Sequence, residues 1–125
     1  ESSKYLPAWR KAVRDAAEFA VTVNGWARVS GPVELEVMFY LDRPSSVSAT
    51  KRPQPTVPPD VDKLLRGIQD SLSGVVYDDD AQIIRVLAWK VYADAREPGA
   101  FIRVNELSQF DNTVFQSFDF LDIPE

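Results

Sequence analysis

The sequence predicts a single α+β domain in which a small mixed β-sheet packs against two α-helices. Segments 8–20 and 62–74 repeat apolar residues at three- and four-residue steps, as amphipathic helices do. Segment 33–41 alternates apolar with polar residues, which is typical of a strand with one buried face. The length of 125 residues and the hydrophobic content of 45% fit one domain with a modest core.

The remaining segments complete this α+β order. Gly25 predicts the end of the first helix. Five prolines among small polar residues predict a long, mobile loop over 43–59. Segment 81–94 is rich in β-branched and aromatic residues and predicts a long strand, and 100–107 predicts another, paired with it as an antiparallel hairpin. The tryptophans Trp9, Trp26 and Trp89 are expected in the core rather than at an interface.

The composition limits the chemistry, because the sequence contains neither cysteine nor histidine. Disulfides, thiolate or imidazole metal sites, and Ser-His or Cys-His catalysis are therefore excluded. Acid–base or metal chemistry must use carboxylates, lysine, tyrosine or water, and hard oxygen ligands favour Mg²⁺, Mn²⁺ or Ca²⁺. No apolar run approaches the roughly 20 residues of a membrane span, so no membrane partner is expected.

The charge is unevenly distributed along the chain. The net charge is −5, and five acidic residues but no basic one follow Arg103. Residues 1–105 therefore balance 14 basic against 14 acidic side chains, and segment 43–66 has a basic excess. This distribution predicts a local basic surface beside a carboxylate cluster.

Six aspartates lie in the stretch PPDVDKLLRGIQDSLSGVVYDDDAQI, residues 58–83. Asp60 and Asp62 lie two apart where an extended segment enters a helix, so they can face one space. Asp80 directly precedes the next expected strand, and its convergence with them would require a divalent cation to offset the repulsion. The alternatives are that one of the pair only caps the helix, and that Asp78 lies in a solvated turn.

A polar stripe is predicted on the second helix, because Asp62, Arg66 and Asp70 lie four residues apart. Arg66 is placed to reach whatever Asp62 binds. The alternative is a surface salt bridge, worth about 0–1 kcal/mol.

These motifs resemble the RusA family of Holliday-junction resolvases, small Mg²⁺-dependent endonucleases of bacteria and their phages. The family pattern of P-D-x-D-N-L-x-K, then D-A-L, then D-D-A/S-Q-I/V stands here as PDVDKLLR, DSL and DDDAQI, followed by WKVY. The likeness covers about 60–104. It implies a cytoplasmic homodimer, in a bacterial or phage-infected cell, that cuts two opposed strands of a four-way DNA junction.

The resemblance also implies roles for particular residues. Asp60, Asp62 and Asp80 would hold Mg²⁺, with Mn²⁺ as a substitute, and Arg66 would join them as a catalytic residue. Asp79, Gln82 and Asp70 would support the site. The expected DNA contacts are Lys51, Arg52, Lys63, Arg66 and Lys90.

Two departures from the family pattern bear on the chemistry. Lys63 stands where the family has asparagine, and Arg66 stands where it has lysine. Arginine can hold a phosphate with two hydrogen bonds but cannot donate a proton at neutral pH. An alternative function is therefore a non-cleaving phage protein that keeps the fold and binds DNA or a replication partner. A third is a less selective Mg²⁺ nuclease acting on forks or flaps.

The end of the chain differs in character from the rest. We divide the chain into a nuclease domain, 1–107, whose N-terminal strand we expect to precede residue 1, and an acidic aromatic tail, 108–125. The tail sequence DFLDIP is similar to the acidic tip of single-stranded-DNA-binding proteins, which implies a weak protein partner. The alternative, which we favour, is that the tail packs its phenylalanines on the sheet or forms an edge strand.

Overall fold

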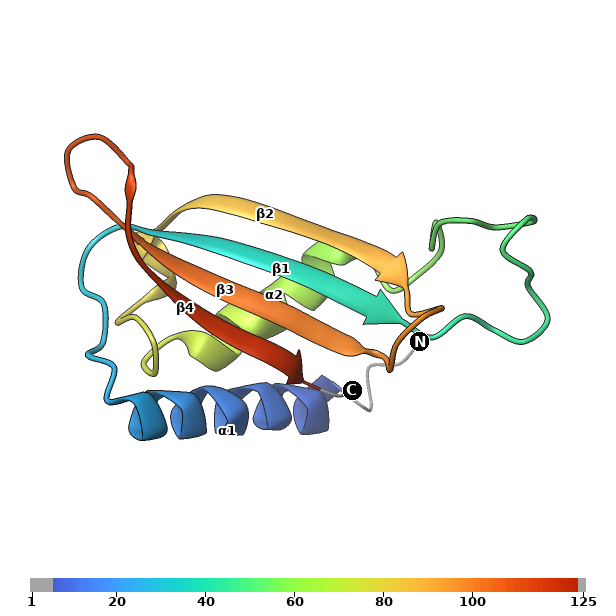
Figure 1. Ribbon diagram of the computed structural model, residues 1–125, viewed down its shortest axis with the longest axis horizontal. Coiled ribbons are helices and arrows are strands. Elements are labelled where there is room, and N and C mark those ends of the chain that lie inside the picture. Colours follow the sequence, from blue (N-terminus) through green and yellow to red (C-terminus); the bar gives the residue numbers. More distant parts are fainter. Residues whose placement is uncertain (1–5, 124–125) are drawn as a thin grey trace.

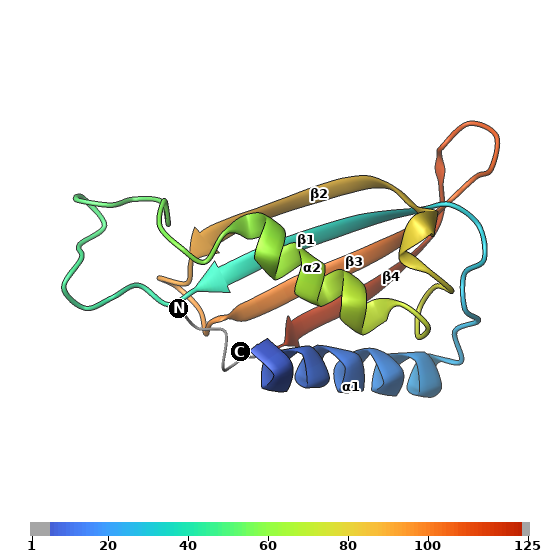
Figure 2. The same ribbon diagram turned by 180° about the vertical axis from the view of Figure 1, so that it is seen from behind.

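The computed structural model describes residues 6–123, with their side chains from Trp9 to Asp119. In this part of the chain, two helices cover one face of a four-stranded mixed sheet (Figures 1 and 2), which confirms the predicted α+β class. Neither helix is long and apolar enough to cross a membrane. The elements are α1 Leu6–Asn24, β1 Val33–Leu41, α2 Val61–Leu72, a 3-10 turn Asp80–Gln82, β2 Ile83–Tyr92, β3 Gly99–Leu107 and β4 Val114–Ile123.

The strand order is β2-β1-β3-β4, so β1 lies inside the sheet. It pairs in parallel with β2 and antiparallel with β3. The predicted hairpin between segments 81–94 and 100–107 is therefore wrong. The connection between these strands instead crosses the end of β1, where Ala93 N–H donates to the carbonyl of Leu41 at 2.7 Å. Neighbours in sequence favour a hairpin, but β1 lies between them, where both of its edges are hydrogen-bonded.

The core lies between β1 and the helices. Every second residue of β1 is buried, and Val33, Leu35 and Val37 are fully buried. The apolar faces of both helices pack onto this row through α1 residues such as Val13 and α2 residues such as Ile68. Each side chain buried in this way contributes about 1.5–3 kcal/mol relative to an exposed one. Both helices predicted from apolar periodicity are thus confirmed.

The tryptophans divide between the core and the surface. Trp9 is buried, and Trp26 packs against the core, as expected. Trp89 is 37% exposed on β2, so its expected place in the core is wrong. The reason is that β2 is an edge strand, which the helices cover only in part.

The C-terminal segment forms β4, which pairs antiparallel with β3 at the sheet edge. This confirms the edge-strand alternative for Val114–Ile123. Phe118 is 2% exposed and meets the Trp26 ring edge-on at 4.8 Å between centroids. Phe110 and Phe115 remain exposed. The side chains of residues 120–124, which make up the tip-like sequence DFLDIP after Asp119, lie outside the described residues, so the tip hypothesis stays a prediction.

We predict that Phe118→Ala lowers the free energy of unfolding by about 3–5 kcal/mol, because it empties a filled core position on β4. Phe115→Ala is the matched control and should change stability by less than about 0.5 kcal/mol, since its ring is exposed. Urea unfolding of the three proteins measures both values. Equal small effects would mean that β4 is dispensable for the core.

Candidate functional site

Two free carboxylates stand at the start of α2. Asp60 occupies the N-cap position with extended backbone (φ −71°, ψ 144°), yet its side chain makes no capping hydrogen bond. Asp62 lies in the first helical turn, and both side chains are exposed. Val61 between them packs against the core. The interpretation of Asp60 as a mere side-chain cap is therefore wrong, and both carboxylates remain available to a ligand.

The stripe on α2 carries basic groups beside these acids. Lys63 and Arg66 are exposed, and Arg66 makes no ion pair with any residue that the structure describes. Asp70, in contrast, faces Arg10 of α1 at 3.6 Å. The stripe thus carries a bridge between the helices at Asp70 and a free guanidinium at Arg66, one turn from Asp62.

Lys90, which we predicted to contact DNA, is already engaged. Its Nζ donates to the carbonyls of Val57 and Pro59, at 2.8 Å each. These carbonyls belong to the residues directly before Asp60. An ammonium has three N–H donors, so this contact uses two of them.

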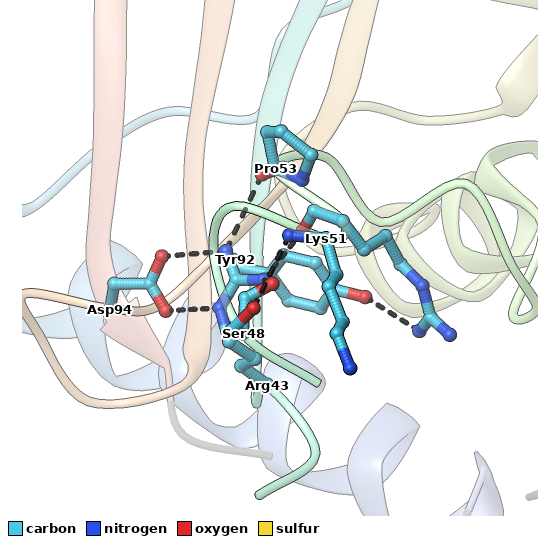
Figure 3. A network of polar contacts seen from close by, with 7 residues as sticks. Arg43, Ser48, Lys51, Pro53, Tyr92 and Asp94 are labelled. Carbon is cyan, nitrogen blue, oxygen red and sulfur yellow. Dashed lines mark hydrogen bonds and ion pairs between the residues drawn. The ribbon is translucent and has the colours of Figure 1, made fainter. Parts of the chain in front are cut away.

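The loop 43–59 extends beyond the ends of β1 and β2 (Figure 1) and is organised by Arg43. Its guanidinium forms a two-bond ion pair with Asp94, at 2.8 Å for each bond, and lies 4.0 Å from the Tyr92 ring centroid (Figure 3). This guanidinium lowers the pKa of Asp94 through the hydrogen bonds. Arg43 also donates to the loop carbonyls of Ser48, Arg52 and Pro53. Although we predicted a mobile loop, these contacts tie its first half to the sheet.

The other two basic residues of the loop, Lys51 and Arg52, differ in surroundings. Arg52 donates to the hydroxyl of Tyr92 at 3.1 Å and is half-buried. Lys51 is exposed, and its backbone N–H donates to the Ser48 carbonyl (Figure 3). The fixed turn thus presents the Lys51 ammonium to solvent, which suits a contact to a phosphate.

The Asp80 region forms a capped turn rather than the start of a strand. Asp79 accepts a hydrogen bond from Ala81 N–H at 2.9 Å, and the Gln82 side chain accepts one from Asp79 N–H at 2.7 Å. The Gln82 amide also donates to the carbonyls of Val29 and Gly31. Asp79 and Gln82 therefore fix the turn that carries Asp80. The strand begins at Ile83, two residues after the predicted start at residue 81.

Asp80 is in an unfavourable position for a charge. Its Oδ1 atom is buried and has no hydrogen-bond partner among the described residues. Burial raises the pKa of Asp80, and the nearby charges of Asp70 and Asp79 raise it further. An orphaned carboxylate oxygen with a raised pKa suits a cation ligand, since a bound cation would supply the missing partner.

The structure does not bring Asp80 to Asp60 and Asp62 within one chain. Asp80 lies close enough to Asp70, in the last third of α2, for the charge of Asp70 to raise the pKa of Asp80, whereas Asp60 precedes the helix. The ten residues from Asp60 to Asp70 span about 15 Å along the helix, a separation that no single ion bridges. Among the described side chains, from Trp9 to Asp119, no three carboxylates lie close enough to hold a metal. The expected single pocket is thus absent from one chain, while Asp60 and Asp62 still fit a hard cation as oxygen donors.

These features define a small α+β protein with free carboxylates and a fixed basic loop at one end of its sheet. The chain belongs to the RusA family, since the family model described as endodeoxyribonuclease RusA matches residues 2–105. It is also similar to the uncharacterized protein YqaN of Bacillus subtilis (strain 168), with 33% identity over 89 residues. That alignment covers 64% of this chain and 61% of the relative, so the chain spans about three fifths of that protein. No solved structure matches.

Sequence reasoning missed the contacts of Arg43 and Lys90. Arg43 opens the loop, and nothing in the sequence except its charge marks it. Its partner Asp94 follows a strand 51 residues later. The partners of Lys90 are backbone carbonyls, which leave no mark in a sequence. A signal existed only for Lys90, through its place in the motif shared with the family.

We predict that Asp80→Asn raises the free energy of unfolding at pH 7 by about 0.5–1 kcal/mol, as removal of a poorly placed charge does. The folded state raises the pKa of Asp80, so ionisation costs stability above that pKa. Below the ordinary value of 3.8, both states hold the proton and the gain disappears. Urea unfolding at pH 7 and pH 3 measures this dependence. Asp78→Asn, which removes a surface partner of Arg28, is the control and should bring no gain.

Proposed function

We propose that the protein is a Mg²⁺-dependent endonuclease that nicks branched DNA and resolves four-way junctions. The observation that carries this proposal is the pair of exposed carboxylates, Asp60 and Asp62, at the motif shared with the RusA family. The Asp60 side chain makes no capping hydrogen bond. Because its proposed substrate is branched DNA, we expect the protein to act in the cytoplasm of a bacterial or phage-infected cell.

Asp60 and Asp62 would hold the cation at the start of α2. When bound, Mg²⁺ polarises a phosphodiester and lowers the pKa of a water nucleophile, and Mn²⁺ can substitute. Arg66, one turn along, binds a phosphate oxygen through its free guanidinium and offsets charge that develops there. It donates no proton at neutral pH, so protonation of the leaving oxygen falls to water or to Lys63.

Phosphate contacts would supply most of the DNA affinity. The loop 43–59 and the start of α2 lie toward one end of the sheet (Figure 2). The loop carries Lys51 and Arg52, and the first half of α2 carries Lys63 and Arg66. The proposed function thus requires the DNA backbone to approach this end, where the excess of basic residues lies. Neutralising several phosphates makes binding fall steeply with salt.

A homodimer formed through β2 would complete the metal site. In the described sheet, β2 is an edge strand, and it exposes apolar side chains on both faces. Ile84, Val86, Leu87 and Trp89 are 37–55% exposed. A long apolar edge is a liability in a monomer, and a twofold axis is the commonest way to cover one.

Antiparallel pairing of β2 with its copy would place the start of one strand beside the end of the other. The Asp80 turn directly precedes β2, and Lys90 near the end of β2 contacts the residues before Asp60. The partner's Asp80 would therefore approach Asp60 and Asp62. This arrangement gives the orphaned Asp80 oxygen a cation partner and requires two chains for each site.

We predict that the protein nicks a synthetic four-way junction with Mg²⁺ and not with EDTA, and that Asp60→Asn lowers the rate at least about 100-fold. Glu97→Gln, an exposed acid after β2, is the control and should leave the rate unchanged. Gel assays on junction, flap and duplex DNA measure substrate selectivity. Equal cutting of all three would indicate a less selective nuclease.

Mixing two inactive variants tests whether one site draws on both chains. Asp60→Asn and Asp80→Asn proteins, refolded together, should recover nicking, because each mixed dimer keeps one intact shared site. Equal mixing leaves about a quarter of the wild-type sites intact. Sites contained within one chain would give no recovery, since every site would lack one ligand.

A second candidate function is DNA or partner binding without cleavage. Two observations favour it: no three-carboxylate site lies among the described side chains of one chain, and Arg66 replaces the family lysine. A protein that binds the junction but leaves it uncut with either Mg²⁺ or Mn²⁺ would establish this candidate instead.

A further inference from the structure

We propose that Lys90 is a positioning residue that sets the place of Asp60, rather than a contact to DNA. The inference rests on the proposed function in one respect, namely that Asp60 binds a divalent cation. Lys90 is the only one of the five expected DNA contacts whose side chain donates to two backbone carbonyls of one short segment, among the residues described.

The backbone of Asp60 is held on both sides. On the helical side, its carbonyl accepts the first α2 hydrogen bond from Leu64 N–H at 3.2 Å. On the loop side, Lys90 holds the carbonyls of Val57 and Pro59, at 2.8 Å each. The carboxylate of Asp60 has no capping bond of its own. Its location therefore depends on these backbone anchors.

The sheet directs the Lys90 side chain toward this segment. Lys90 lies beside Phe39 in the parallel pairing of β1 and β2, and Phe39 is buried on the helix-covered face. The lysine stem therefore runs along that face to the start of α2. A charged ammonium makes stronger bonds to carbonyls than a neutral donor does, so it can hold a segment that lacks regular structure.

The loop is thus tied at two points. Arg43 fixes residues 48–53, and Lys90 fixes residues 57–59. Only the second anchor adjoins Asp60. A change at Lys90 should therefore disturb the metal ligand and leave the phosphate-contacting part of the loop in place.

The experiment compares Lys90→Met with Lys51→Met in the full chain. Two quantities are measured: the Mg²⁺ concentration for half-maximal nicking, and the junction Kd in Ca²⁺ over a range of salt. Loss of a residue that orients a ligand typically weakens metal affinity or activity about 10–100-fold. We expect this shift for Lys90→Met, with an unchanged salt slope.

The Lys51 control should show the reverse pattern. Removing one phosphate contact lowers the salt slope by about one and leaves the Mg²⁺ requirement unchanged. If Lys90→Met behaves like this control, Lys90 contacts DNA and the proposal is overturned. Lys90→Arg, which keeps a charged donor, should recover part of the Mg²⁺ affinity. Failure of Lys90→Arg to differ from Lys90→Met would also count against positioning.

Two readouts separate this proposal from the proposed function. Amide hydrogen exchange should speed up at residues 64–66, the first amides of α2 with a helical hydrogen bond, in Lys90→Met and stay unchanged in β1, whether or not the protein cuts DNA. Mn²⁺ binding by electron paramagnetic resonance, without DNA, should weaken in the same variant. A wild-type protein that binds Mn²⁺ but cuts no junction would overturn the nuclease alone, whereas unchanged exchange and Mn²⁺ binding in Lys90→Met would overturn only the role of Lys90.

Discussion

The arrangement depends on β1 being hydrogen-bonded along both edges. Its parallel pairing with β2 cannot be made by a tight turn, so the chain must cross over between the two strands. The loop 43–59 and helix α2 form that crossover. Because α2 starts where β1 ends, the paired aspartates come to the carboxyl end of two parallel strands, a common place for ligands in sheets of this kind.

Much of the fold could be predicted from local patterns. The alternation in β1 and the apolar steps in both helices each report one buried face, and such a face shows in the sequence directly. The strand order does not show in the sequence in this way, because it depends on which strand is hydrogen-bonded along both edges. The expected hairpin failed for this reason: segments 81–94 and 100–107 are neighbours in sequence, but β1 needed two partners.

The candidate site was predictable in its chemistry and less so in its geometry. Asp60 and Asp62 stand exposed at the helix start, as their spacing indicated. The place of Asp80 was harder, because a 3-10 turn held by the Gln82 side chain changes its direction before β2 begins. Contacts to backbone carbonyls, such as those of Lys90, depend on the folded path alone. The sequence can therefore identify the carboxylates that would bind a metal, but it does not show whether one chain or two supply them to a site.

The Arg43 contacts affect how the loop 43–59 meets a ligand. Ordering one residue of free chain costs about 1–2 kcal/mol, so a floppy arm would lose much of its contact energy on binding. Residues 48–53 are already ordered in the folded protein, because the Arg43 guanidinium uses all of its N–H groups to hold them and Asp94. The backbone around Lys51 therefore needs no ordering when a ligand binds. This favours rapid binding and selection of ligands by shape over adaptation of the loop to different ligands.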